Sequence, residues 1–107
     1  MVRILEEMEM YAKENHIPIM QQDGIEFLLD YIKNHRIKRI LEIGTAIGYS
    51  AIRMALINSN IEVVTIERDE ERYKEAISNI KKAHVEQQIT PILKDAFDYR
   101  CCKSTIY

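Results

Sequence analysis

LEIGTAIGYS, residues 41–50, holds two of the three glycines in the chain. The apolar run at residues 38–43 leads into it and predicts a short buried strand. Gly44 and Gly48 then enclose a turn, and residues 49–57 predict a helix that is apolar on nearly every side. Because glycine has no Cβ, such a turn lets the backbone approach a ligand closely. The stretch therefore predicts a strand, a ligand-facing turn and a buried helix in succession.

The segments on either side alternate between helical and extended patterns. Residues 2–15 predict an amphipathic helix, and a second one is expected to start near Asp23, which we interpret as its N-cap. Residues 61–67 and 88–93 predict strands, and residues 69–82 predict the helix between them. This order implies right-handed crossovers and a parallel sheet of the α/β class. Ligands of such sheets bind at the carboxyl ends of the strands.

Composition indicates one soluble globular domain, with 107 residues, 47% hydrophobic residues and a net charge of −2. No apolar run approaches the roughly 18 residues that span a bilayer, and no secretory signal is recognisable. The adjacent Cys101 and Cys102 form neither a disulfide framework nor a zinc site. We therefore expect a cytoplasmic protein.

The charge argues against bulk electrostatic binding of nucleic acid but leaves room for a local basic patch. Lys33, Arg36, Lys38 and Arg39 form one such cluster. Contact with RNA phosphates is one interpretation of it, and a solvated turn between helix and strand is the plainer one.

Glu67 ends the second predicted strand, and a carboxylate at that position can accept both hydroxyls of a ribose. The backbone N–H groups at the start of the following helix, near Ser50, can face polar ligand atoms. With Gly44 and Gly48, these groups predict a crevice that binds a nucleoside.

The glycine spacing G-x-x-x-G differs from the G-x-G-x-x-G of dehydrogenases and from the Walker pattern. No Lys or Arg in the turn could meet a diphosphate, so a cofactor with a ribose and no phosphates fits better. S-adenosylmethionine is such a molecule, and Glu42 would add negative charge near its sulfonium or ammonium group. A turn-capping role for Glu42 and a dehydrogenase half remain open as alternatives.

The run Glu-Ile-Gly-Thr-x-x-Gly-Tyr-Ser, together with residues 63–67, resembles motifs I and II of class I S-adenosylmethionine-dependent methyltransferases. It is similar to the catechol and caffeoyl-CoA O-methyltransferase type. Residues 18–20, the helix after Asp23 and residues 94–96 look most like a bacterial branch that methylates 5-hydroxyuridine in tRNA. The resemblance covers about residues 5–98 and implies part of a Rossmann-like fold, with three parallel strands, flanking helices and no C-terminal half.

The resemblance also implies roles for single residues. Met20 would lie beside the cofactor, Ser50 would touch it, Glu67 would hold the ribose, and Asp95 and Ala96 would meet the adenine. A core side chain remains the alternative for Met20, and a solvated loop residue for Asp95. No catalytic residue and no metal ligand is assigned in this chain.

In the family that this sequence resembles, a divalent metal ion such as Mg²⁺ is bound by an Asp after a fourth strand and by a later Asp-Asn pair. These residues would follow residue 98 and are not found here. We therefore interpret residues 1–98 as the N-terminal half of a methyltransferase domain. Residues 99–107 do not resemble the family, and we interpret them as a non-family tail, such as a frameshifted end.

Two hypotheses follow for function. The chain is the cofactor-binding part of an O-methyltransferase whose parent reaction converts 5-hydroxyuridine in tRNA to 5-methoxyuridine, and alone it is inactive. The alternative is a non-catalytic or decayed module that binds S-adenosylmethionine or a nucleotide.

Without a fourth strand, the backbone of Ile40, Leu41 and Ile43 would form an open edge, and such edges invite self-association. We therefore expect a homo-oligomer or an aggregation-prone fragment. Pro91 lacks an N–H group, which places the strand at 88–93 at an edge as well.

Overall fold

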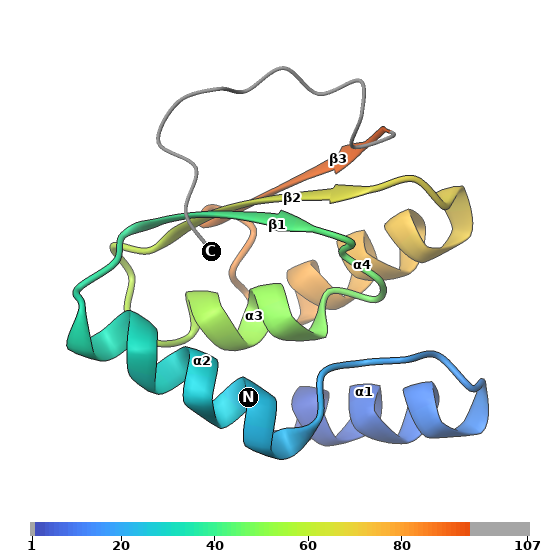
Figure 1. Ribbon diagram of the computed structural model, residues 1–107. Coiled ribbons are helices and arrows are strands. Elements are labelled where there is room, and N and C mark those ends of the chain that lie inside the picture. Colours follow the sequence, from blue (N-terminus) through green and yellow to red (C-terminus); the bar gives the residue numbers. More distant parts are fainter. Residues whose placement is uncertain (1, 95–107) are drawn as a thin grey trace.

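The computed structural model describes residues 2–94 (Figure 1). Its elements are, in order, α1 (Val2–Glu14), α2 (Gln22–Asn34), β1 (Arg39–Ile43), α3 (Tyr49–Ala55), β2 (Glu62–Glu67), α4 (Glu70–Lys82) and β3 (Ile89–Leu93). The three strands are parallel and lie in the order β1-β2-β3. The predicted α/β class and parallel sheet are therefore confirmed. No helix within residues 2–94 has both the length and the apolar character that crossing a membrane requires.

All four helices lie on one face of the sheet (Figure 1). The core between sheet and helices contains Ile40, Val63 and Ile89, which are neighbours across the three strands. Burial of such a row is the main stabilising contribution to a layered α/β domain. The helix α3 lies at the centre of this core, as its sequence predicts, although it ends at Ala55 rather than at residue 57.

Both outer strands of the described sheet have one unpaired side. The edge strand β3 contains Pro91, opposite Thr65 of β2, which confirms the prediction from its missing N–H group. No strand within residues 2–94 pairs with the outer side of β1. At the end of that edge, Ile43 is 53% exposed. The described part of the chain thus presents an apolar strand edge.

The start of α2 differs from the prediction. The N-cap is Gln21, in an extended conformation and without a side-chain hydrogen bond, so the assignment of Asp23 as N-cap is wrong. The helix begins two residues earlier than Asp23 implied, at Gln22, whose side chain donates to Glu26 at 2.8 Å. At α4, by contrast, Asp69 caps the first turn, because Oδ1 accepts from the backbone N–H groups of Glu71 and Arg72.

Candidate functional site

The turn between β1 and α3 requires its two glycines. Gly44 and Gly48 have φ values of +90° and +91°, in the region that L side chains rarely adopt. At Gly48 an added Cβ would also lie 3.4 Å from the Cβ of Ala76 in α4. This bend, residues 44–48, is joined to β2 by the N–H groups of Gly44 and Thr45, which both donate to the Ile66 carbonyl. The bend is therefore held at the carboxyl ends of β1 and β2.

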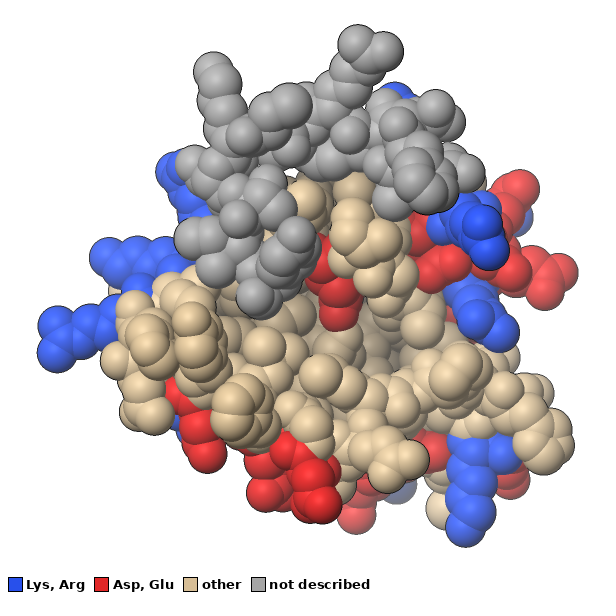
Figure 2. Space-filling view, viewed as in Figure 1, with Lys and Arg blue, Asp and Glu red and all other residues tan. Residues whose placement is uncertain are grey.

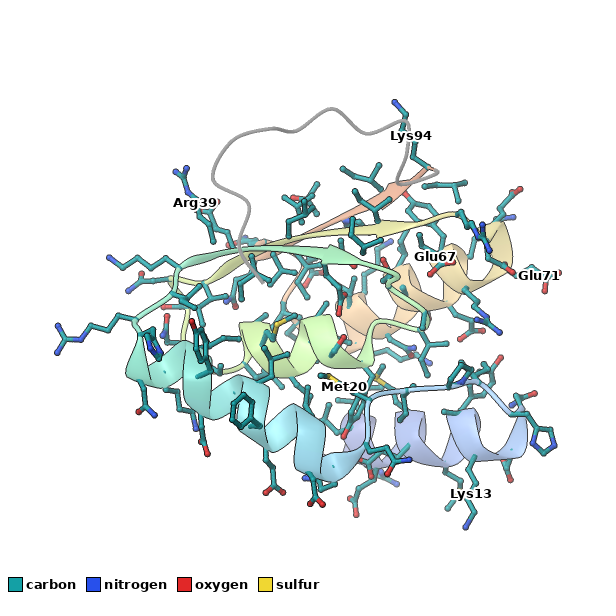
Figure 3. The ribbon with its side chains drawn as sticks, viewed as in Figure 1. Lys13, Met20, Arg39, Glu67, Glu71 and Lys94 are labelled. Carbon is teal, nitrogen blue, oxygen red and sulfur yellow. The ribbon has the colours of Figure 1, made fainter. Side chains whose placement is uncertain are left out.

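The carboxylate of Glu67 lies against the same bend. Oε1 accepts from the backbone N–H of Ala46 at 2.8 Å, and Oε2 accepts from that of Asp69 at 3.0 Å. The residue is only 8% exposed, and Figure 3 shows it at the end of β2, whereas Glu71 lies at the outer rim of α4. The structure thus brings together the acidic residue and the glycine turn that the sequence singled out.

A second carboxylate, Glu42, lies one strand away and is held by hydroxyl groups. The Ser50 hydroxyl donates to Oε2, and Thr65 Oγ1 donates to Oε1 at 2.7 Å. Thr65 Oγ1 in turn lies 2.6 Å from Thr45 Oγ1. Sequence reasoning missed both threonines. For Thr65, the available signal was a hydroxyl side chain within the otherwise apolar run of β2.

Burial raises the pKa of the Glu42 carboxyl above its usual value of 4.5. The hydrogen bonds from Ser50 and Thr65 lower the pKa, and the nearby Glu67 carboxylate raises it. The net direction is upward, because loss of hydration outweighs the hydrogen bonds. A carboxylate held in this way favours a positively charged ligand, which would offset the cost of burying negative charge.

A hollow of about 220 Å³ opens beside the bend. The connection between α1 and α2 forms one wall through Pro18, Ile19 and Met20. The opposite wall includes Glu42, Gly44, Thr45, Ala46, Tyr49 and Ser50. Met20 is 43% exposed, so it is not a core side chain (Figure 3). Gly48 and Glu67 do not line this hollow: Gly48 ends the bend, and Glu67 accepts from the Ala46 N–H of the bend.

An apolar hollow of about 250 Å³ adjoins the first one and shares Met20 and Glu42 with it. Its other lining residues lie on α2, on β1 and its approach, and on α3: Leu28, Tyr31, Ile32, Ile37, Ile40, Ile43 and Met54. On the face drawn in Figure 2, uncharged side chains cover most of the centre, where some acidic atoms are also visible, and most charged side chains lie at the rim.

A hydrogen bond from Tyr49 connects α1 to the site. Its hydroxyl donates to Glu9 of α1 and accepts from Arg53 Nη1 at 2.8 Å. Burial and the hydrogen bond to Glu9 raise the pKa of Tyr49. Because Tyr49 also lines the first hollow, this contact positions α1 relative to the hollow.

Two of the predicted site residues, Asp95 and Ala96, lie outside the described residues. Within residues 2–94, no three His, Cys, Asp or Glu side chains form a set that could hold a metal ion. The donor groups of residues 2–94 therefore do not fit a divalent metal ion.

The chain matches proteins that transfer methyl groups. The family model for O-methyltransferases matches residues 2–99. A candidate caffeoyl-CoA O-methyltransferase from Staphylococcus aureus is 36% identical, with a TM-score of 0.86, over 88% of this chain and 45% of its own. The O-methyltransferase from Bacillus cereus, solved in complex with S-adenosylhomocysteine, is 30% identical, with a TM-score of 0.80, over 90% of this chain and 45% of its own.

Among curated proteins, the O-methyltransferase imqG of Aspergillus flavus is 37% identical over 62 residues, which are 58% of this chain and 25% of that protein. The chain thus spans less than half of the two solved structures and a quarter of the fungal relative. The likeness to the solved structures confirms the predicted partial Rossmann-like methyltransferase fold.

We expect Glu42→Gln to stabilise the chain at neutral pH. Because the pKa of Glu42 is raised, the folded chain favours the protonated carboxyl. The contribution of this group to the free energy of unfolding is complete below pH 4.5 and is lost as the pH rises through the pKa of Glu42 in the folded chain. Gln keeps the shape without the buried charge. Thermal unfolding should show a Tm higher by about 2–5 °C at pH 7, with the difference vanishing below pH 4.5.

The matched control is Glu86→Gln, at an exposed position, which should leave Tm nearly unchanged. A Tm for Glu42→Gln that is lower than wild type at every pH would contradict the expectation.

Proposed function

The chain belongs to the O-methyltransferase family, and on that premise we propose that residues 1–98 are the N-terminal, S-adenosylmethionine-binding half of a methyltransferase domain. The observation that carries the proposal is the contact between the Glu67 carboxylate and the bend at residues 44–48. This contact lies at the carboxyl ends of neighbouring parallel strands, where α/β sheets bind nucleotides. The parent reaction is transfer of a methyl group to a hydroxyl oxygen.

S-adenosylmethionine, when bound, supplies a methyl group on a positively charged sulfonium. Glu42 and Ser50 face the hollow beside the bend and would bind its charged and polar groups. Gly44 leaves the backbone open to close approach, because nothing lies within 4 Å of where its Cβ would be. Met20 would pack against the ligand from the connection between α1 and α2.

Glu67 and Gly48 lie at the bend but outside the lining of the hollow. Each carboxylate oxygen of Glu67 accepts one backbone N–H group, and each has capacity for a further hydrogen bond. The ribose hydroxyls would use that capacity. Gly48 permits the close packing of the bend on α4, and Asp95 with Ala96 would meet the adenine.

For the acceptor, we propose 5-hydroxyuridine in tRNA, which would place the protein in the cytoplasm. The support is the resemblance of residues 18–20, the helix after Asp23 and residues 94–96 to the tRNA-modifying branch. We propose that the contacts to the acceptor and to a divalent metal ion lie outside residues 2–94, because the chain spans less than half of the solved structures that it matches.

Titration calorimetry with S-adenosylhomocysteine tests the cofactor site. We expect the chain to bind this product and Glu67→Gln to weaken binding by about 10- to 100-fold, because hydrogen bonds to a charged acceptor are lost. The control Glu71→Gln, at an exposed position of α4, should bind as wild type does. Equal affinity in Glu67→Gln, or binding of NADH in place of the methyl-donor product, would refute the assignment.

Methyl transfer to an anticodon stem-loop that contains 5-hydroxyuridine tests the acceptor. With radiolabelled S-adenosylmethionine, we expect transfer by a parent protein, meaning one that contains this segment within a whole methyltransferase domain. We expect none by this chain alone. Transfer to an unmodified uridine stem-loop, used as the control, should not occur. If the parent protein leaves 5-hydroxyuridine unmethylated, the proposed acceptor is wrong.

We further propose that the chain self-associates through the outer edge of β1, where Ile43 is 53% exposed. Sedimentation velocity should show a concentration-dependent oligomer, and Ile43→Lys should shift it toward the monomer, because an edge charge opposes strand pairing. The control is Leu93→Lys at the end of β3, which is 42% exposed. A sedimentation result that shows a monomer at all concentrations would contradict this proposal.

A further inference from the structure

Two buried hydroxyl groups connect Glu42 to the bend. Thr65 lies beside Glu42 in the parallel register of β1 and β2, and its Oγ1 donates to Glu42 Oε1 at 2.7 Å. Thr45, the second residue of the bend, places its Oγ1 2.6 Å from Thr65 Oγ1. Both threonines are buried, and Thr65 does not line the hollow. Thr65 therefore reaches a ligand in the hollow only through other side chains.

When Glu42 is ionised, the donor and the acceptor of each hydrogen bond in this series are fixed. A threonine hydroxyl has one proton, and Thr65 donates its proton to Glu42. Thr45 must then donate to Thr65 in the 2.6 Å contact. Ser50 donates to the other Glu42 oxygen. The arrangement thus presents donors to both oxygens, which favours the carboxylate over the carboxylic acid.

We propose that Thr45 and Thr65 are positioning residues that hold Glu42 as an oriented carboxylate, and that they thereby set a preference for the positively charged methyl donor over its neutral thioether product. The inference rests on the proposed function, because it concerns the ligand assigned to that hollow. It extends the site to Thr65, which does not line the hollow.

Few other titratable groups in the described residues surround Glu42. Glu67 approaches from β2, Tyr49 from α3 and Tyr31 from α2, whereas the connection between α1 and α2 contributes apolar side chains. Burial and Glu67 raise the pKa of Glu42, and the hydrogen bonds from Ser50 and Thr65 lower it. Removing the Thr65 hydroxyl should therefore raise the pKa of Glu42 further.

The test compares Thr65→Val, which keeps the shape and removes the hydroxyl, with Thr65→Ser, which keeps the hydroxyl. The side-chain carboxyl carbon of Glu42 is followed by NMR against pH in the ligand-free chain. We expect the midpoint to rise by about one pH unit in Thr65→Val and to stay near wild type in Thr65→Ser. Thr45→Val, which removes the next donor, should shift it in the same direction by less.

Calorimetry with S-adenosylmethionine and S-adenosylhomocysteine then measures the preference. At a pH halfway between the wild-type and Thr65→Val midpoints, the ratio of the two affinities should fall by about threefold in Thr65→Val, chiefly through the methyl donor. Thr65→Ser should restore the ratio. Thermal unfolding of each variant checks that it is folded; if Thr65→Val is not, Thr45→Val is measured in its place.

The outcomes separate this inference from the proposed function. An unchanged Glu42 midpoint, or equal weakening of both ligands at every pH, overturns the inference and leaves the cofactor site standing. If the wild-type chain binds neither ligand, the proposed function fails and the ligand preference with it. In that case a raised Glu42 midpoint in Thr65→Val supports only the orientation of Glu42 by the hydroxyls.

Discussion

The hydrogen bond from the Ala46 N–H to the Glu67 carboxylate is the contact on which the site depends. It joins the turn after β1 to the end of β2, and the Ile66 carbonyl strengthens the junction by accepting from two further N–H groups of the bend. A bend with two left-handed glycines would otherwise be free to move, because glycine loses much conformational freedom on folding. Anchoring at this point gives the hollow a defined wall.

The two carboxylates near the bend have different environments and hence different tasks. Glu67 is held by backbone N–H groups, whereas Glu42 is held by hydroxyl groups beside an apolar hollow. The raised pKa of Glu42 shows that its ionised form is disfavoured in the folded chain. Buried charge of this kind reduces stability unless a partner compensates it. A cationic ligand would be such a partner, which links the instability of the site to the proposed function.

The proposed cofactor site is built mainly from one continuous segment. The β1-α3-β2 segment supplies the bend and both carboxylates within residues 39–67, and the segment before α2 supplies the remaining wall. The hydrogen bonds that join the bend, Glu42 and Glu67 all lie within this segment, so they can be present in a chain that spans less than half of the solved methyltransferases it matches. The outer side of β1, by contrast, has no strand partner among the described residues.

The sequence alone predicted the parallel α/β order, the glycine turn, the edge position of Pro91 and the place of Glu67, because periodicity, positive φ and a missing N–H group are local properties. It misplaced the N-cap of α2, because the extended residue before the helix is Gln21 and Asp23 already lies in the first turn. Only the tertiary structure showed two of the hydrogen bonds, the one between Thr45 and Thr65 and the one from Tyr49 to Glu9. Each depends on the register of strands or the packing of helices that lie far apart in the chain, and no local pattern encodes that register.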